Sequence, residues 1–212
     1  RLADTYATNS LSSPSVVNSS TRTPFYKNLS DFSKDLKIKE KAKLASFQAE
    51  NIYVGYKYYE TRYEDCIRGR FHASSDVGSS QSQSWSYENE VSFPFGYGLS
   101  YSTFEEEILS MERTKEEIKL KVEVTNVSSW KGKDVVQVYA STPYSEYEME
   151  NEVEKSAVVL VGFAKTKELE SNERQVLEIS IDPYLLSSYD EKNKKTFYLS
   201  KGDYYLSFPI DK

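Results

Sequence analysis

The second half of the chain alternates apolar and polar residues with a period of two, which is typical of strands with one buried face. Residues 117–126 show this most clearly, with charged side chains on one face and four apolar ones on the other: Ile118, Leu120, Val122 and Val124. Residues 174–182 repeat the pattern. Five further segments have strand composition: 105–111, 134–141, 156–166, 196–200 and 203–210. Seven strands separated by turn residues predict a mainly β fold, a seven-stranded immunoglobulin-like sandwich of the fibronectin type III kind over residues 105–212.

The segments between these strands look like turns and loops. Lys201-Gly-Asp203 predicts a tight hairpin turn between residues 196–200 and 203–210. Residues 142–154 are polar and acidic, so we expect a loop there. No helix is predicted after residue 104.

The first half lacks a persistent period. Residues 1–34 and 71–90 are rich in small polar residues and predict irregular chain. Residues 35–47 carry four lysines, which we interpret as a solvated surface segment rather than an anion-binding patch. Residues 52–59 combine Tyr, Val and Ile and so have strand composition. Residues 1–104 as a whole therefore predict a largely irregular, extended segment.

Composition and charge narrow the class of protein. Aromatic residues make up 14% of the chain, a share that disordered proteins do not reach. Residues 1–104 carry a net charge of +1 and residues 105–212 one of −7, giving the total of −6. The acidic second half argues against a nucleic-acid partner, because phosphates require clustered Lys and Arg. No apolar run approaches the roughly 20 residues needed to span a membrane.

The cysteine, the histidine and the processing signals of the chain point to no particular catalytic or metal-binding chemistry. Cys66 is the only cysteine, so no intrachain disulfide forms, which slightly favours a cytoplasmic over a secreted location. With His72 as the only histidine, a structural zinc site is excluded, and we expect an unreactive thiol and a loop histidine. No signal peptide is recognisable, although Arg1 is not a natural start and is consistent with removal of an upstream segment. Three tripeptides match the glycosylation pattern by chance, in our interpretation: those at Asn18, Asn28 and Asn126.

Glu60, Glu64 and Asp65 form the best candidate carboxylate cluster in the chain. Glycoside hydrolysis uses two carboxyl groups, one as acid and one as nucleophile or base. The alternative is a charged loop with Arg62 as the partner of these groups, since clustered surface carboxylates are common. We favour the charged loop, because nothing in the sequence indicates a raised pKa.

The segment at residues 91–104 is the densest run of aromatics and glycines. Its core, Phe93-Pro-Phe-Gly-Tyr-Gly-Leu-Ser-Tyr-Ser-Thr-Phe104, resembles the segment that leads into the fibronectin type III-like domain of glycoside hydrolase family 3 β-glucosidases. Pro94 fixes the chain, Gly96 and Gly98 permit close backbone approach, and several aromatic side chains are available for burial. We interpret it as a packed joint, one side fastened to the sandwich and the other built to meet a domain that this sequence does not contain.

Further blocks extend the resemblance along most of the chain. Tyr53-Val-Gly-Tyr-Lys-Tyr-Tyr-Glu60 is similar to the family's Gly-Tyr-Arg-Tyr-Tyr motif, with Lys57 in place of the usual Arg. Arg1-Leu-Ala-Asp-Thr5 resembles the end of the family's α/β sandwich domain. Later strands of the fibronectin-like domain are matched by three blocks: residues 133–139, 160–165 and 202–206.

The resemblance implies a retaining exo-glycosidase acting on β-linked glucosides, with an aspartate nucleophile on a barrel domain and an acid/base glutamate on the α/β sandwich domain. This chain shows neither motif, so no catalytic, cofactor-binding or metal-binding residue is assigned. The implied organisation is the tail end of the α/β sandwich domain with an aromatic linker in residues 1–104, followed by the fibronectin-like domain. The implied partners are the barrel and α/β sandwich domains of the same parent enzyme, and β-glucosides through that parent. The family occurs with the barrel before or after this region, and the sequence leaves both orders open.

Three functions remain open. The first is a non-catalytic accessory portion that packs against the catalytic domains and stabilises them. The second is a carbohydrate-binding module in which Trp85, Trp130 and the tyrosines of residues 53–63 stack on sugar rings. The third and least favoured is a small hydrolase built on the carboxylates of residues 60–65.

Overall fold

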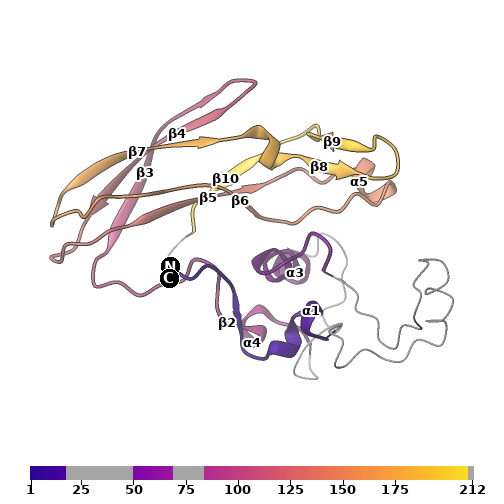
Figure 1. The fold of residues 1–212 in the computed structure, drawn as a ribbon, viewed down its shortest axis with the longest axis horizontal. Helices are drawn as coiled ribbons and strands as arrows, with labels where there is room; N and C mark the ends of the chain where they lie inside the picture. Colours follow the sequence, from indigo (N-terminus) through magenta and orange to yellow (C-terminus); the bar gives the residue numbers. More distant parts are fainter. Residues whose placement is uncertain (18–49, 69–83, 210–212) are drawn as a thin grey trace, which may run out of the picture. The chain divides into compact units, whose positions relative to one another are not determined.

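The computed structural model describes residues 1–17, 50–68 and 84–209, and these form two compact units. One unit comprises Leu2–Gly96, and the other comprises Tyr97–Lys212 together with Arg1. Figure 1 shows the elements of both. Three groups of predictions lie outside the described residues: those on the lysine run 35–47, on His72, and on Asn18 and Asn28.

The larger unit is a β-sandwich, which confirms the predicted fold class. One antiparallel sheet has the order β3-β4-β7, from strands Phe104–Arg113, Ile118–Asn126 and Arg174–Ile181. The other has the order β10-β5-β6, from strands Tyr205–Ser207, Val135–Ser141 and Val159–Lys165. The register places Val122 of β4 opposite Leu177 of β7, so the two alternating patterns turn their apolar sides to the same face.

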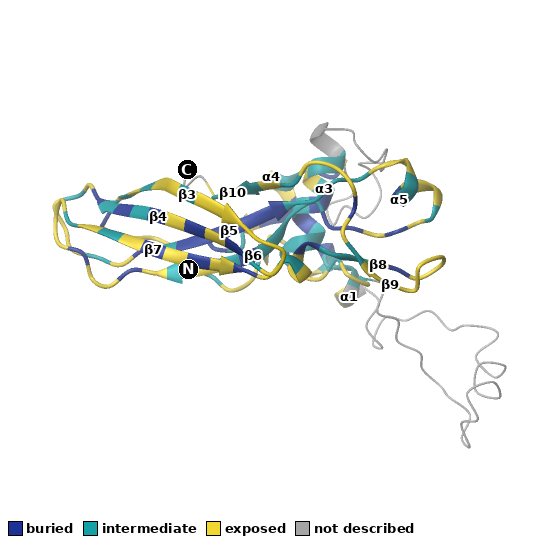
Figure 2. Cartoon of the chain, turned by 90° about the horizontal axis from the view of Figure 1, so that it is seen from above, coloured by how far each residue is buried: buried dark blue, intermediate teal, exposed yellow. Residues whose placement is uncertain are grey.

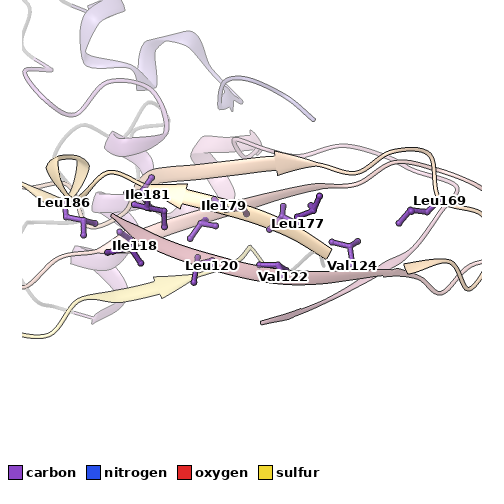
Figure 3. Close-up of a cluster of buried hydrophobic side chains, with 13 residues drawn as sticks. Ile118, Leu120, Val122, Val124, Leu169, Leu177, Ile179, Ile181 and Leu186 are labelled. Atoms are coloured by element: carbon purple, nitrogen blue, oxygen red, sulfur yellow. The ribbon is translucent and has the colours of Figure 1, made fainter. Parts of the chain in front are cut away.

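The core of the sandwich lies where these alternating faces meet (Figure 3). All four apolar residues predicted on one face of β4 are buried, whereas Lys119 and Lys121 between them are exposed and Glu123 is half-buried (Figure 2). Val136, Val138 and Ala140 of β5 and Val161 of β6 close the core from the second sheet. Gly162 allows β6 to approach β7 closely, because a Cβ there would lie 2.8 Å from Cγ2 of Ile179.

One end of the sandwich differs from the prediction. The strand Thr196–Tyr198 (β9) pairs with Ser188–Asp190 (β8), whereas β10 pairs with β5. The predicted hairpin around Lys201-Gly-Asp203 is therefore wrong, because this turn carries the chain from one sheet to another. A short 3-10 helix, η2 (Pro183–Leu186), links β7 to β8.

The predicted loop at residues 142–154 contains a helix, α5 (Glu146–Glu150), so the expectation of no helix after residue 104 is also wrong. The helix begins with a capping box, in which the Ser145 side chain and the Glu148 side chain each bond to the other's backbone N–H. The Ser-x-x-Glu spacing was the sequence signal for this helix.

The smaller unit holds short elements around a small core of Tyr59, Trp85 and Val91. Its elements are β1 (Tyr6–Ala7), η1 (Ser10–Ser12), α1 (Pro14–Val17), α3 (Tyr56–Arg68), α4 (Tyr87–Glu90) and β2 (Val91–Phe93), with β1 paired to β2. The strand predicted over residues 52–59 is wrong, because α3 begins at Tyr56. Tyrosine favours strands, but the Lys, Glu and Arg residues that follow are good helix formers, and Gly55 with a φ of +60° starts the helix abruptly.

Candidate functional site

The carboxylates singled out in the sequence lie on α3, not on a loop. Glu60 and Glu64 are one helical turn apart and share a side of the helix. Burial raises the pKa of Glu60, while a hydrogen bond donated by the Tyr87 hydroxyl at 2.6 Å lowers it and the neighbouring Glu64 raises it further. Burial also raises the pKa of Asp65, against the attraction of Arg62. Raised pKa values are a property of catalytic acids that the sequence did not indicate.

The surroundings of these carboxylates explain them as parts of a packed unit. The Arg62 guanidinium lies 5.3 Å from the ring centre of Trp85, and the rings of Tyr63 and Tyr87 meet edge to face at 5.4 Å. Tyr87 thus contacts two residues of α3. Its hydroxyl group donates to Glu60, and its ring packs against the ring of Tyr63. The side of α3 that carries Glu60 faces aromatic packing, so we assign no catalytic role to the cluster.

Glu60→Gln is expected to change the pH dependence of stability in the smaller unit. A carboxyl group whose pKa is raised on folding binds its proton more tightly in the folded state, so stability falls as pH rises from about 4.5 through the folded pKa. The amide keeps an acceptor for Tyr87 and carries no charge, so this fall should be reduced. Thermal unfolding followed by Trp85 fluorescence in a Trp130→Phe background, between about pH 4 and pH 8, measures the slope. Glu88→Gln, at an exposed position of α4, is the matched control, and equal slopes in both variants would contradict the expectation.

The aromatic residues proposed for sugar stacking are not available as a group. Trp85 is only 3% exposed and belongs to the core with Tyr59. A ring in that position cannot meet a sugar, so this part of the carbohydrate-binding interpretation is wrong. Trp130 is exposed, but its ring makes no ring-to-ring contact within the described residues.

An acidic depression of about 470 Å³ lies over β3, β4 and β7. Glu105, Glu106, Glu107 and Glu123 line it, and the Arg174 guanidinium bonds to Glu123 at 3.0 Å. Among the residues that the structure describes, no group of three or more His, Cys, Asp or Glu side chains is placed to hold a metal ion. The same residues include no helix long and apolar enough to cross a membrane.

In the 97–104 segment, the second half of the predicted joint, Ser102 is fastened to the sandwich, whereas residues 98–101 are exposed. Ser102 is buried, and its hydroxyl donates to the Trp130 carbonyl oxygen at 3.0 Å. Gly132 packs against Ser102 so closely that a Cβ there would lie 2.4 Å from the serine hydroxyl oxygen. Leu99 and Tyr101, in contrast, are 91% and 92% exposed. The backbone is thus held in place while two large apolar side chains face solvent.

Arg1 and Asp134 fasten the start of this segment. The Arg1 guanidinium donates to the buried Asp134 carboxylate at 3.0 Å, and Gly98 lies against the Arg1 backbone, where a Cβ would be 3.3 Å from the Arg1 Cα. Arg1 and Asp134, which are far apart in the sequence, therefore fix the segment that exposes Leu99 and Tyr101.

The sequence did not reveal a buried polar network beneath α5. Lys155 and Glu148 form an ion pair at 3.2 Å with side chains 5% and 1% exposed. Lys155 also donates to the Pro143 carbonyl oxygen at 2.7 Å and to Ser200 at 2.5 Å, and Tyr198 donates to Glu148 at 2.9 Å. Burial acts to raise the pKa of Glu148, but the hydrogen bonds from Ser145, Ser200 and Tyr198 outweigh it and hold that pKa far below its ordinary value. We call this set the Lys155–Glu148 network.

Asn126 is completely buried, so the glycosylation tripeptide that it begins is not accessible in the folded protein. Its side-chain amide donates to the carbonyl oxygens of Trp130 and Leu169 at 2.8 and 2.9 Å. Its side-chain oxygen accepts from Ser128. The interpretation of this tripeptide as a chance match agrees with this position.

Comparisons with known proteins place these features in a family. Residues 134–208 match the family model described as "Fibronectin type III-like domain". A β-glucosidase of Ruminococcus albus is 37% identical over 145 residues, which cover 68% of this chain and 12% of the relative. β-Glucosidase A of Butyrivibrio fibrisolvens is 33% identical over 175 residues, covering 74% of this chain and 18% of the relative.

Solved structures agree. A β-glucosidase from Paenibacillus barengoltzii superimposes with a TM-score of 0.66 at 28% identity, covering 97% of this chain and 18% of that one. The β-glucosidase from Kluyveromyces marxianus gives a TM-score of 0.57 at 30% identity over 77% of this chain and 16% of that one. The chain therefore spans only 12% to 18% of the length of these relatives.

Proposed function

Because this chain belongs to the β-glucosidases of glycoside hydrolase family 3, as their C-terminal region with the fibronectin type III-like domain, we propose that it is a non-catalytic portion of such an enzyme. In this proposal it packs against the catalytic domains of the parent and stabilises them. Hydrolysis of β-glucosides resides in parts of the parent that this sequence does not contain. The barrel and α/β sandwich domains are then its partners.

The observation that carries the proposal is the exposure of Leu99 and Tyr101. Single exposed apolar side chains are common on protein surfaces. Leu99 and Tyr101, however, lie two residues apart, are both more than nine-tenths exposed and stand on a backbone that is held in place, which is the arrangement expected of a contact site. Fully burying one leucine and one tyrosine contributes about 3–5 kcal/mol. Both residues lie in the 91–104 segment, whose sequence resembles the family.

The fastening of the segment supports the same conclusion. Ser102, Gly132 and the Arg1–Asp134 ion pair hold the backbone, so little conformational entropy is lost when a partner covers Leu99 and Tyr101. A loop held only at its ends would lose more conformational entropy when a partner bound. The segment is therefore preorganised for docking.

A chimera tests the proposal. The region of the Kluyveromyces marxianus β-glucosidase that matches this chain is replaced by this chain, and hydrolysis of a nitrophenyl β-glucoside is measured together with thermal stability. We expect the chimera to hydrolyse the glucoside and the isolated chain to show no turnover. Leu99→Ser with Tyr101→Ser should lower the activity that survives brief heating by at least about tenfold, because about 3–5 kcal/mol of contact is lost.

Met149→Ser with Val176→Ser is the matched control, since both residues are exposed and lie on other elements of the sandwich, α5 and β7. The control should leave the chimera close to the unsubstituted one. Turnover by the isolated chain, or an inactive chimera, would contradict the proposal. Equal effects of the two double substitutions would contradict the role of Leu99 and Tyr101.

A further inference from the structure

Trp130 lies directly beside the 97–104 segment and is largely exposed. It belongs to residues 127–132 of the connection between β4 and β5, which we call the Trp130 turn. Its side chain is 67% exposed. The hydroxyl group of Ser102, the residue after Tyr101, donates to the Trp130 carbonyl oxygen at 3.0 Å. The Trp130 turn is therefore a direct neighbour of the segment that exposes Leu99 and Tyr101.

The main chain of the Trp130 turn is held at both of its ends. At the first end, the Val127 N–H group donates to the Thr103 carbonyl oxygen at 2.9 Å. At the second end, the backbones of Gly132 and Leu169 exchange hydrogen bonds of 3.1 and 2.8 Å. The main chain is thus fixed on both sides of Trp130, while the indole ring extends into solvent. A ring displayed in this way loses little conformational entropy when a partner covers it.

The shape of this surface suits a protein partner better than a small molecule. Small-molecule sites are concave, whereas none of Leu99, Tyr101 and Trp130 lines the depression over β3, β4 and β7. Together the three side chains leave about 450 Å² of largely apolar surface in water. That area is about half of what one partner contributes to a protein–protein interface of standard size. Tryptophan and tyrosine are also among the residues that contribute most to binding in such interfaces.

The position of the Trp130 turn indicates which protein covers it. In the proposed function the catalytic domains of the parent enzyme cover Leu99 and Tyr101. Because Ser102 bonds to Trp130, a surface that covers Tyr101 also reaches the Trp130 turn. The chain spans only 12% to 18% of the length of its relatives, so most of a parent enzyme lies outside this sequence and offers such a surface.

We propose that Trp130 is a further anchor of the docking surface, whose indole ring inserts into an apolar recess of the parent's catalytic domains beside Leu99 and Tyr101. This inference rests on the proposed function and extends the contact from one segment to two. A sandwich docked through residues 97–104 alone could pivot about that segment. Since the Trp130 turn joins β4 to β5, a second contact there fixes the orientation of the sandwich itself.

Hydroxyl-radical footprinting of Trp130 tests the burial of this ring. The complete 212-residue chain is compared with the chimera that carries it in the Kluyveromyces marxianus β-glucosidase. We expect fast oxidation of Trp130 in the isolated chain, where the ring is 67% exposed, and oxidation at least about tenfold slower in the chimera. Met149, exposed on α5, is the internal reference and should react equally in both.

Trp130→Ala tests the contribution of the ring to the assembled enzyme. The variant chimera should retain at least about tenfold less activity after brief heating, because the anchoring contact is lost. Tyr205→Ala is the matched control, since Tyr205 is an aromatic residue of β10 with a nearly equal exposure of 66%, and it should behave like the unsubstituted chimera. Alanine keeps the carbonyl oxygen that Ser102 needs, so the urea midpoint of the isolated chain should be unchanged in both variants.

Four results would overturn the inference. They are undiminished oxidation of Trp130 in a folded chimera, equal surviving activity of the Trp130→Ala and Tyr205→Ala chimeras, a lower urea midpoint of the isolated Trp130→Ala chain, and a dimer of the isolated chain that dissociates in Trp130→Ala. The third would assign Trp130 to the stability of the sandwich, and the fourth to an interface between copies.

The two proposals can fail separately, because footprinting requires a folded chimera but not an active one. Circular dichroism establishes that the chimera is folded. Protection of Trp130 in a folded but inactive chimera would refute the proposed function alone. An active chimera in which Trp130 is oxidised as fast as in the isolated chain would refute this inference alone.

Discussion

Replacing Lys155 by methionine should lower the free energy of unfolding of the sandwich by about 3–5 kcal/mol. The substitution leaves the Glu148 carboxylate, which is 1% exposed, buried without its cation. It also removes donors from the Pro143 carbonyl oxygen and from Ser200. Urea unfolding followed by far-ultraviolet circular dichroism gives the free energy.

Two controls separate this effect from an ordinary surface charge. Lys131→Met breaks an ion pair with Glu168 whose side chains are 59% and 50% exposed, and should cost less than about 1 kcal/mol. Lys155→Met with Glu148→Leu removes both buried charges and should be more stable than Lys155→Met alone, because no unpaired charge remains. A loss in Lys155→Met no larger than that in Lys131→Met would show that the network does not hold this end of the sandwich.

Asn126→Ala should be the second large effect, a loss of about 2–4 kcal/mol in the free energy of unfolding. The amide of Asn126 donates to the carbonyl oxygens of Trp130 and Leu169, which belong to two different connections between strands. Alanine leaves both acceptors without this donor and removes the acceptor for Ser128. The same urea titration measures the loss.

Asn172→Ala is the matched control, because Asn172 is exposed and its side chain bonds only to the neighbouring Ser171 within the described residues. Alanine at this left-handed backbone position adds strain of about 1 kcal/mol, so its loss should stay close to that value. Since Asn172 has a positive φ of 62°, Asn172→Gly distinguishes backbone strain from side-chain loss. Similar losses in Asn126→Ala and Asn172→Ala would mean that the buried amide does not tie the two connections together.

The sandwich was predictable where local pattern and tertiary environment agree. In β4 the alternation in sequence equals the alternation in burial, because one face of the strand lies on the core. The same holds for β7. Prediction failed at residues 196–210, because strand composition does not say which strand is the partner. Lys201-Gly-Asp203 is a turn, but its two flanking strands belong to different sheets.

The helix α3 was mistaken for a strand because four tyrosines between residues 53 and 59 outweighed the helix formers that follow. Tyrosine is tolerated in a helix when its ring packs on a core, as Tyr59 does. The domain assignment of residues 1–104 to the end of an α/β sandwich domain stays a prediction.

The candidate sites also differ in whether they could be recognised from the sequence. The segment at residues 91–104 could be recognised from its sequence, since its aromatics and glycines are contiguous and resemble one family. The Lys155–Glu148 network could not, because it joins residues 148 and 155 to residues 198 and 200, which are distant in sequence. Tyr147 meets Asp190, and Lys155 meets Ser200, only after β8 and β9 have taken their places in the fold. Their burial and their partners are properties of the assembled sandwich.

Docking through Leu99 and Tyr101 is tested by hydroxyl-radical footprinting of both residues, first in the isolated chain and then in the chimera with the Kluyveromyces marxianus β-glucosidase. Met149, exposed on α5, serves as the internal reference. If the 97–104 segment docks on the rest of the enzyme, oxidation of Leu99 and Tyr101 should be fast in the isolated chain and at least about tenfold slower in an active chimera. Equal oxidation of these two residues in the isolated chain and in the active chimera would show that the 97–104 segment does not dock on the rest of the enzyme.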